Sequence, residues 1–230
     1  MSSDFRRFGL VAVAAACVAA PRAAHGQHLR GRLAGLNASL GADAAEHRVD
    51  AGDGVERSAG GLVRVELRYP ARDWLEVRGS VARGSLAART DSAADRDVSE
   101  LALGAAVTPL RWLALDAGTS VRRYTSALAD QRWVGLHVGA EARLALLGDG
   151  LRGVVRAALL PAVSVTGQPA PDVALAAGAG LEARRDRLSA ALTYSLERYD
   201  FPAVLRVQDN ARVRRLEQFS TLGVRVGLRL

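Results

Sequence analysis

Only three histidines follow residue 26, and His47 is the one whose neighbours could support acid–base catalysis. The segment around it carries four carboxylates, Asp43, Glu46, Asp50 and Asp53. A carboxylate that holds an imidazole in place can make it a general base, so this segment is the best candidate for a hydrolytic site. Acidic residues beside a single histidine are more commonly a solvated connection, however, and we expect no catalytic residue.

The same acidic segment could instead bind Ca²⁺ together with a second acidic stretch that contains Asp91, Asp95 and Asp97. The spacing of these acids is not that of an EF-hand loop. Cys17 is the only cysteine, so the chain after it can form neither a disulfide framework nor a thiolate metal site. No glycine-rich phosphate loop, zinc-ligand spacing or Gly-x-Ser-x-Gly element occurs either. We therefore expect no metal and no cofactor.

The elements that must position these side chains are β-strands, because the dominant period after residue 27 is two. Val63, Val65 and Leu67 alternate with Arg64 and Glu66, and later segments repeat the pattern. Period two with one apolar and one polar face is typical of a strand between two different surroundings. Most segments approach the 9–11 residues that a tilted strand needs to cross a bilayer. The ten segments are 29–41, 61–69, 74–84, 98–107, 112–122, 132–146, 151–165, 172–184, 188–200 and 212–230.

Short and long connections alternate along this series. Tight turns are expected at 70–73, 108–111, 147–150 and 184–187, and longer polar links at 42–60, 85–97, 123–131, 166–171 and 201–211. This rhythm, with both termini on the short-turn side, is typical of an up-and-down barrel. We predict an all-β fold, an up-and-down antiparallel transmembrane β-barrel of about ten strands, with eight as the fallback. The first segment is the least regular, because its apolar parity switches near Gly35.

The distribution of charge distinguishes this barrel from a soluble sandwich, which also alternates. From residue 61 onward the apolar parity is almost free of charge, and its exceptions, Arg83, Arg123 and Arg198, lie at strand ends where they can reach headgroups. The other parity combines small residues with charges of both signs, which suits a narrow polar lumen. Unpaired buried charges are costly, so these must pair. The predicted lumen polar network comprises Arg64, Glu66, Arg68, Glu76, Arg78, Asp116, His137, Glu141, Arg143, Arg156, Glu182 and Arg225.

Pairing within this network can be sketched from the sequence. One allowed register of the hairpin between the second and third segments sets Arg68 against Glu76, and Glu66 against Arg78. His137 and Glu141 share the lumen face, but residues four apart along a strand are not adjacent. A place in the polar network is therefore the expected role of His137.

The first 26 residues have the three-part pattern of a secretory signal peptide. Arg6 and Arg7 precede an apolar run over 8–20, and small residues at positions 24 and 26 suit cleavage before Gln27. The apolar run is too short to span a bilayer as a helix. A lipoprotein site at Cys17 is the alternative. We expect a signal peptide over 1–26 and one barrel domain over 27–230.

The last strand alternates apolar and polar residues and the chain stops on an apolar one, Leu230. This pattern resembles the terminal strand of small bacterial outer-membrane β-barrel proteins, although that family usually ends in an aromatic residue. Aromatic residues also fall at two levels, beside the short turns (Tyr69, Trp74, Trp112) and beside the long links (Tyr124, Trp133, Tyr199, Phe201), as in interfacial girdles. The resemblance implies location in the outer membrane, contact with its lipid and lipopolysaccharide, and recognition of the C-terminal strand by the barrel-assembly machinery.

Composition limits the remaining function classes. All 31 basic residues are arginine, but they are interleaved with acids rather than clustered, so nucleic acid is not an expected partner. We expect a monomeric, porin-like outer-membrane protein of a Gram-negative cell, not an enzyme, with a structural, surface-interaction or narrow-passage role. The alternatives are an omptin-like protease that uses acids and His47 at the extracellular loops, and a soluble periplasmic β-sheet protein that binds a ligand.

Overall fold

The computed structural model describes residues 35–52, 54–127, 130–148, 150–205 and 212–230. The signal peptide expected over 1–26 and the first part of the segment expected at 29–41 lie outside these residues. The described part is built from β-strands. It contains no helix that is long and apolar enough to cross a membrane.

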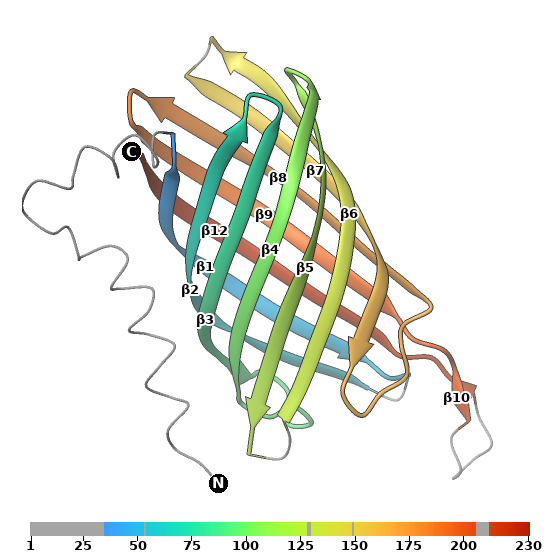
Figure 1. Cartoon of the computed structure of the whole chain (residues 1–230). Coiled ribbons are helices and arrows are strands. Elements are labelled where there is room, and N and C mark those ends of the chain that lie inside the picture. Colours follow the sequence, from blue (N-terminus) through green and yellow to red (C-terminus); the bar gives the residue numbers. More distant parts are fainter. Residues whose placement is uncertain (1–34, 53, 128–129, 149, 206–211) are drawn as a thin grey trace, which may run out of the picture. The chain divides into compact units, whose positions relative to one another are not determined.

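Ten long antiparallel strands close into a barrel, which confirms the predicted all-β, up-and-down architecture (Figure 1). Each strand is hydrogen-bonded to its neighbours in the chain, and the first and last long strands, β1 and β12, close the ring. The strands are β1 (Asn37–Asp50), β2 (Val55–Arg72), β3 (Leu75–Ala88), β4 (Arg96–Leu110), β5 (Leu113–Ser126), β6 (Asp130–Leu147), β7 (Leu151–Val165), β8 (Val173–Arg185), β9 (Leu188–Asp200) and β12 (Leu216–Arg229). A small separate hairpin, β10 (Val204–Leu205) and β11 (Arg212–Val213), lies in the link before β12.

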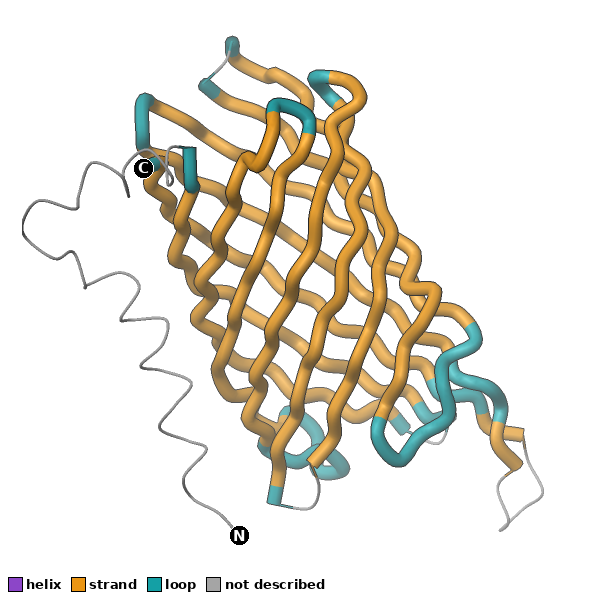
Figure 2. The backbone as a smooth tube through the Cα atoms, viewed as in Figure 1, coloured by secondary structure: helices purple, strands orange, loops and turns teal. Residues whose placement is uncertain are grey.

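The two ends of the barrel differ in their connections, as the sequence predicts. The tight turns after β2, β4, β6 and β8 gather at the end that also holds the C-terminus, and the other links, with the β10–β11 hairpin, gather at the opposite end (Figures 1 and 2). We call these the turn end and the loop end. The links after β1 and β3 are shorter than expected, because the strands run further: β3 ends at Ala88 and β4 begins at Arg96. The link between β7 and β8 is about as long as expected.

The prediction of the first strand is wrong. The segment expected at 29–41 gives way to β1 at Asn37–Asp50, and the expected link at 42–60 contains only the short connection from 51 to 54. The predicted acidic loop is therefore strand, with Asp43 and His47 buried inside the barrel. Alanine fills many outward positions of β1, so its apolar pattern is weak in the sequence.

The predicted register of the second hairpin is also wrong. Arg68 pairs with Arg78, and Pro70 pairs with Glu76. The ladder shifts at a bulge between Pro70 and Arg72, close to the turn. Proline has no N–H to donate to the ladder, so a bulge there is the expected accommodation.

Candidate functional site: the barrel lumen

A chain of ion pairs crosses the middle of the bore. Arg64 donates to Asp43 at 2.7 Å and to Glu100 at 2.8 Å. Arg122 lies 2.6 Å from the other oxygen of Glu100 and reaches Glu197 at 2.7 Å. Since β5 and β9 lie on opposite sides of the ring, the Arg122–Glu197 contact spans the bore rather than following the wall. These side chains occupy space that an open channel would need.

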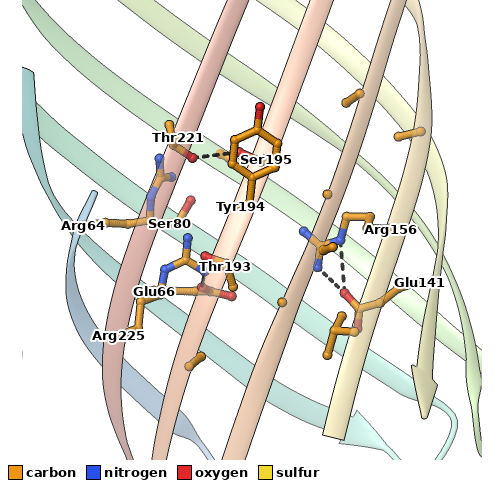
Figure 3. Close-up of a pocket in the computed structure, with 18 of the residues that line it drawn as sticks. Arg64, Glu66, Ser80, Glu141, Arg156, Thr193, Tyr194, Ser195, Thr221 and Arg225 are labelled. Carbon is orange, nitrogen blue, oxygen red and sulfur yellow. Dashed lines mark hydrogen bonds and ion pairs between the residues drawn. The ribbon is translucent and has the colours of Figure 1, made fainter. Parts of the chain in front are cut away.

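A second ion cluster centres on Glu141, whose side chain is 2% exposed. It pairs with Arg78 at 3.2 Å, with Arg143 at 2.6 Å and with Arg156 (Figure 3). Glu76 adds a second carboxylate, 2.5 Å from Arg78. One buried carboxylate is therefore shared by three guanidinium groups, and Glu76 offsets part of their remaining charge.

The remaining predicted lumen residues form smaller contacts. Glu66 pairs with Arg68 at 2.6 Å and with Arg225 at 3.2 Å, and these three line the cavity. His137 lies 3.3 Å from Asp116 and not beside Glu141. Glu182 pairs with Arg184 near the turn end. Arg225 also lies 3.9 Å from Asp43, which links the Glu66 group to the ion pairs that cross the bore. The pairs differ from the sketched register.

The loop end of the barrel has an apolar interior. Buried aromatic rings pack edge to face: Tyr124 against Trp133 and Phe219, and Trp133 against Tyr199 and Phe201. Leu62, Leu86 and Val98, each no more than 2% exposed, belong to the same cluster. We call this cluster, with Val163 and Val165, the loop-end core. The guanidinium of Arg122 lies 4.0 Å from the Phe219 ring centroid, which joins the core to the ion pairs below it.

The outward face inverts at the same end. Outward positions near the loops are polar and exposed, among them Glu46, Asp97, Ser99, Arg123 and Arg132. Toward the turn end the outward positions are apolar and exposed, as at Leu103 and Leu144. Most strands thus run from a membrane-type pattern, apolar outside and polar inside, to a water-soluble pattern with the opposite arrangement, whereas β8 keeps an exposed Val173 at its loop end.

This inversion corrects the expected aromatic girdle at the loop end. Tyr124, Trp133, Tyr199 and Phe201 are at most 5% exposed and lie inside the barrel, not at a lipid interface. At the turn end the expectation agrees with exposure, since Tyr69, Trp74 and Trp112 are all exposed. Parity alone could not distinguish the two cases, because it does not say where along a strand the inside changes from polar to apolar.

His47 lies in the loop-end core rather than on a loop. Its Nε2 is 2.8 Å from Glu217 and its Nδ1 is 3.0 Å from an Arg96 nitrogen, while its ring stacks on Tyr124 at 4.9 Å. Arg215 also pairs with Glu217. Because a guanidinium only donates, Nδ1 accepts and Nε2 donates to the carboxylate. Both ring nitrogens are engaged and the side chain is 3% exposed, so the imidazole has no nitrogen available to a substrate at the rim.

Sequence reasoning missed several members of the site. Asp43 and His47 were assigned to a link because the first strand was misplaced, and Glu217 was not considered as a partner of His47. Glu100, Arg122 and Glu197 carry the lumen parity and were available from the alternation. The alternation therefore indicates that the residues of the ion pairs across the bore face inward. It does not indicate that Arg122 and Glu197 face one another.

A cavity of about 310 Å³ remains beside the ion pairs. Charged side chains line it from opposite parts of the ring, Arg64 and Glu66 from β2 and Arg156 from β7 (Figure 3). Small and hydroxyl side chains of β8, β9 and β12 form the wall between them, where Ser195 and Thr221 share a 2.7 Å hydrogen bond. Within the described residues no cluster of three or more metal-ligating side chains occurs. The lumen is thus a small polar cavity with one wall made mainly of small side chains.

Comparison with known proteins identifies the fold. No family model and no curated protein sequence matches the chain. Among solved structures, the outer membrane protease OmpT from Escherichia coli superposes with a TM-score of 0.61 at 8% identity, over 85% of this chain and 97% of that one. The chain has the fold of bacterial outer-membrane β-barrels.

Two further neighbours are of the same kind but superpose less well. The translocator domain of the autotransporter NalP from Neisseria meningitidis gives a TM-score of 0.45 at 15% identity, over 90% of this chain and 96% of that one. The Neisserial surface protein A gives 0.37 at 14% identity, over 84% and 97%. At such identities the likeness concerns the fold and assigns no activity.

Proposed function

We propose that this protein is an integral outer-membrane β-barrel without enzymatic activity, with a closed bore and a structural or surface-interaction role. The observation that carries the proposal is the inversion of pattern along the strands. An apolar outer belt around the turn-end part suits lipid, and a polar outside over an apolar inside suits water. The barrel then stands in the membrane with its loop end projecting outward, and the loop-end core closes the bore.

The boundary of the apolar belt supports contact with lipopolysaccharide. Outward arginines, Arg83, Arg123, Arg132 and Arg198, lie on the loop side of the belt. Guanidinium groups bind phosphate and carboxylate groups well, and such groups are carried by lipopolysaccharide. The signal peptide expected over 1–26 and the apolar C-terminal strand agree with export and with insertion by the barrel-assembly machinery. A monomer needs no further partner, since the ring of strands is already closed.

The geometry at His47 supports a non-enzymatic role. An omptin-like protease would need acids and a histidine that a peptide could reach, whereas His47 is enclosed by Tyr124 and Phe219 and bound at both nitrogens. The name of the OmpT neighbour is therefore no argument for proteolysis here.

Planar-bilayer recording tests the proposal. The purified protein, inserted from detergent, should give no large porin-like conductance, because the cross-bore ion pairs and the loop-end core leave no continuous water path. Cell fractionation on the same strain should place the protein with the outer membrane. A large, stable single-channel conductance, or recovery in the soluble periplasmic fraction after osmotic shock, would overturn the proposal.

A further inference from the structure

The wall of the barrel is incomplete between β7 and β8. Their ladder runs from the Leu151–Ala183 pair to the Leu159–Leu175 pair and then stops. β7 continues to Val165 along β6, and β8 begins at Val173 along β9, but no pair joins residues 160–165 to β8. The other neighbouring long strands stay paired close to the loop end. The break is therefore local to this one seam.

The sequence of β7 explains the break. The β6–β7 ladder jumps from the Val138–Leu159 pair to the Leu136–Ala162 pair, so Leu160 and Pro161 form a bulge. Proline cannot donate to a ladder, and a bulge turns a strand away from its former neighbour. Beyond the bulge, Val163 and Val165 point into the loop-end core. β7 is thereby held on the β6 side and leaves β8.

The gap is hollow and mainly apolar. A cavity of about 600 Å³ is lined by residues 134–136 of β6, 159–164 of β7 and 170–175 at the start of β8. Asp172 is the only charged residue among them. The outer rim is continuous with the lipid-facing belt, because Leu136, Leu159 and Leu175 are 50%, 61% and 42% exposed. An apolar group that enters from the lipid face meets apolar and small side chains, with Asp172 as the one carboxylate in the lining.

One residue, Leu160, lies between the gap and the lumen. Leu160 lines both the gap and the lumen cavity, and the lumen wall beyond it consists of small side chains such as Ala158, Ala176 and Gly178. The two volumes, about 310 and 600 Å³, are of the size of ordinary ligand pockets, about 300–1,000 Å³. The Leu160 side chain therefore separates the apolar gap from the small side chains of the lumen wall.

We propose that this gap is a lateral binding port for a single-chain amphiphile with an anionic headgroup, taken from the surrounding membrane. The alkyl chain fills the apolar gap and its tip reaches Leu160. The headgroup stays at the outer rim, where Arg198 is the ladder partner of Leu175 and Arg132 lies two residues before Val134. The headgroup and its water also supply polar partners for the unpaired edge of β7, which lipid tails cannot do. The port rests on the proposed location in the outer membrane.

Tryptophan quenching can test the port, because Trp133 borders it. Trp133 pairs with Val165 and directly precedes Val134, which lines the gap. Trp74 and Trp112 lie beside turns at the other end, so replacing both with Phe leaves Trp133 as the sole reporter. The protein is reconstituted in phosphatidylcholine vesicles and titrated with 12-bromododecanoate, whose bromine quenches indole fluorescence on contact. We expect saturable quenching that unbrominated dodecanoate reverses.

A matched pair of variants locates the binding. Ala162→Phe places a ring in the gap, and it should raise the probe concentration for half-maximal quenching about tenfold or more, because the ring occupies the space of the chain. Ala117→Phe adds the same ring to an outward alanine of β5 and should change nothing. Heat-modified migration on gels checks that each variant is folded.

Two results would overturn the port. One is quenching that rises linearly with probe and that dodecanoate does not relieve, which needs no variant to observe. The other is equal saturable quenching in folded Ala162→Phe and Ala117→Phe. Results that contradict the proposed function can be distinguished from results that contradict the port. They are failure to insert into vesicles, or a large conductance, and both are observed before any probe is added.

Discussion

Replacing Glu141 with Gln should destabilise the barrel more than any replacement of one of its arginine partners. Glu141 is 2% exposed and is the shared acceptor of Arg78, Arg143 and Arg156. Removing one member of a buried ion pair costs about 3–5 kcal/mol, because the other charge stays buried without compensation. Glu141→Gln removes the carboxylate that these three cations share.

Two features of the cluster should reduce the free-energy cost of Glu141→Gln. Arg78 and Arg143 keep Glu76, at 2.5 and 3.9 Å, and the Arg156 side chain is 44% exposed to the cavity. We therefore expect Glu141→Gln to lower the free energy of unfolding by about 2–3 kcal/mol. Arg156→Gln leaves Glu141 with two arginines, so it should cost less than about 1 kcal/mol.

Urea unfolding in detergent or vesicles, followed by tryptophan fluorescence, measures both values. The double variant with Gln at both positions should cost less than the sum of the single variants, by about 1 kcal/mol, since it removes one of the stranded cations. If Glu141→Gln unfolds within about 0.5 kcal/mol of the parent, or if Arg156→Gln costs more, the three-to-one arrangement does not contribute as argued.

Three further variants test the other parts of the architecture. Leu103→Arg, in the apolar belt, should cost about 2–4 kcal/mol of unfolding free energy in lipid, whereas Ser99→Arg on the same outward face should cost less than about 1 kcal/mol, and equal costs would contradict the placement of the belt. Phe219→Ala should lower stability by about 3–5 kcal/mol in urea unfolding, and with Arg122→Ala it should raise single-channel conductance, because both side chains close the bore. His47→Gln should cost about 1–3 kcal/mol by removing contacts to a buried carboxylate, and an unchanged midpoint in urea would refute that.

The turn-end half of the barrel could be predicted from the sequence because its alternation is strong there. Val63, Val65 and Leu67 face outward against Arg64 and Glu66, as the pattern indicates. The strand ends on the loop side could not be predicted in the same way. There the outward positions are polar and the inward ones are alanine, valine or aromatic, so a strand resembles a loop to a method that expects apolar residues to face lipid.

In the lumen, the alternation predicts which side chains face inward but not which of them contact one another. It indicates that Arg122 and Glu197 point inward, because each residue's face follows from its position along its strand. Alternation does not indicate that the two side chains meet, since which strands face each other across the bore depends on the number of strands and their stagger. The hairpin of β2 and β3 shows the same limit, because a shift of two residues changed both predicted partners and left the faces unchanged.

For the proposed location in the outer membrane, the point at which the pattern inverts indicates the height at which lipid meets the barrel. A strand that alternated uniformly would give no reason to place lipid at one height rather than another. On β4, Leu103 faces outward, and Glu100 and Ala102 face inward. Four residues from Leu103 toward the loops, Ser99 faces outward and its neighbour Val98 is buried inside. Over these few residues the apolar side chains change from the outer to the inner face of the strand and the polar ones from the inner to the outer face. Lipid suits the outer face of one part of the strand and water suits that of the other. The seam between β7 and β8 opens at the height of Leu159 and Leu175, where the outward apolar belt still continues, so an alkyl chain could enter the gap while its headgroup stays in water.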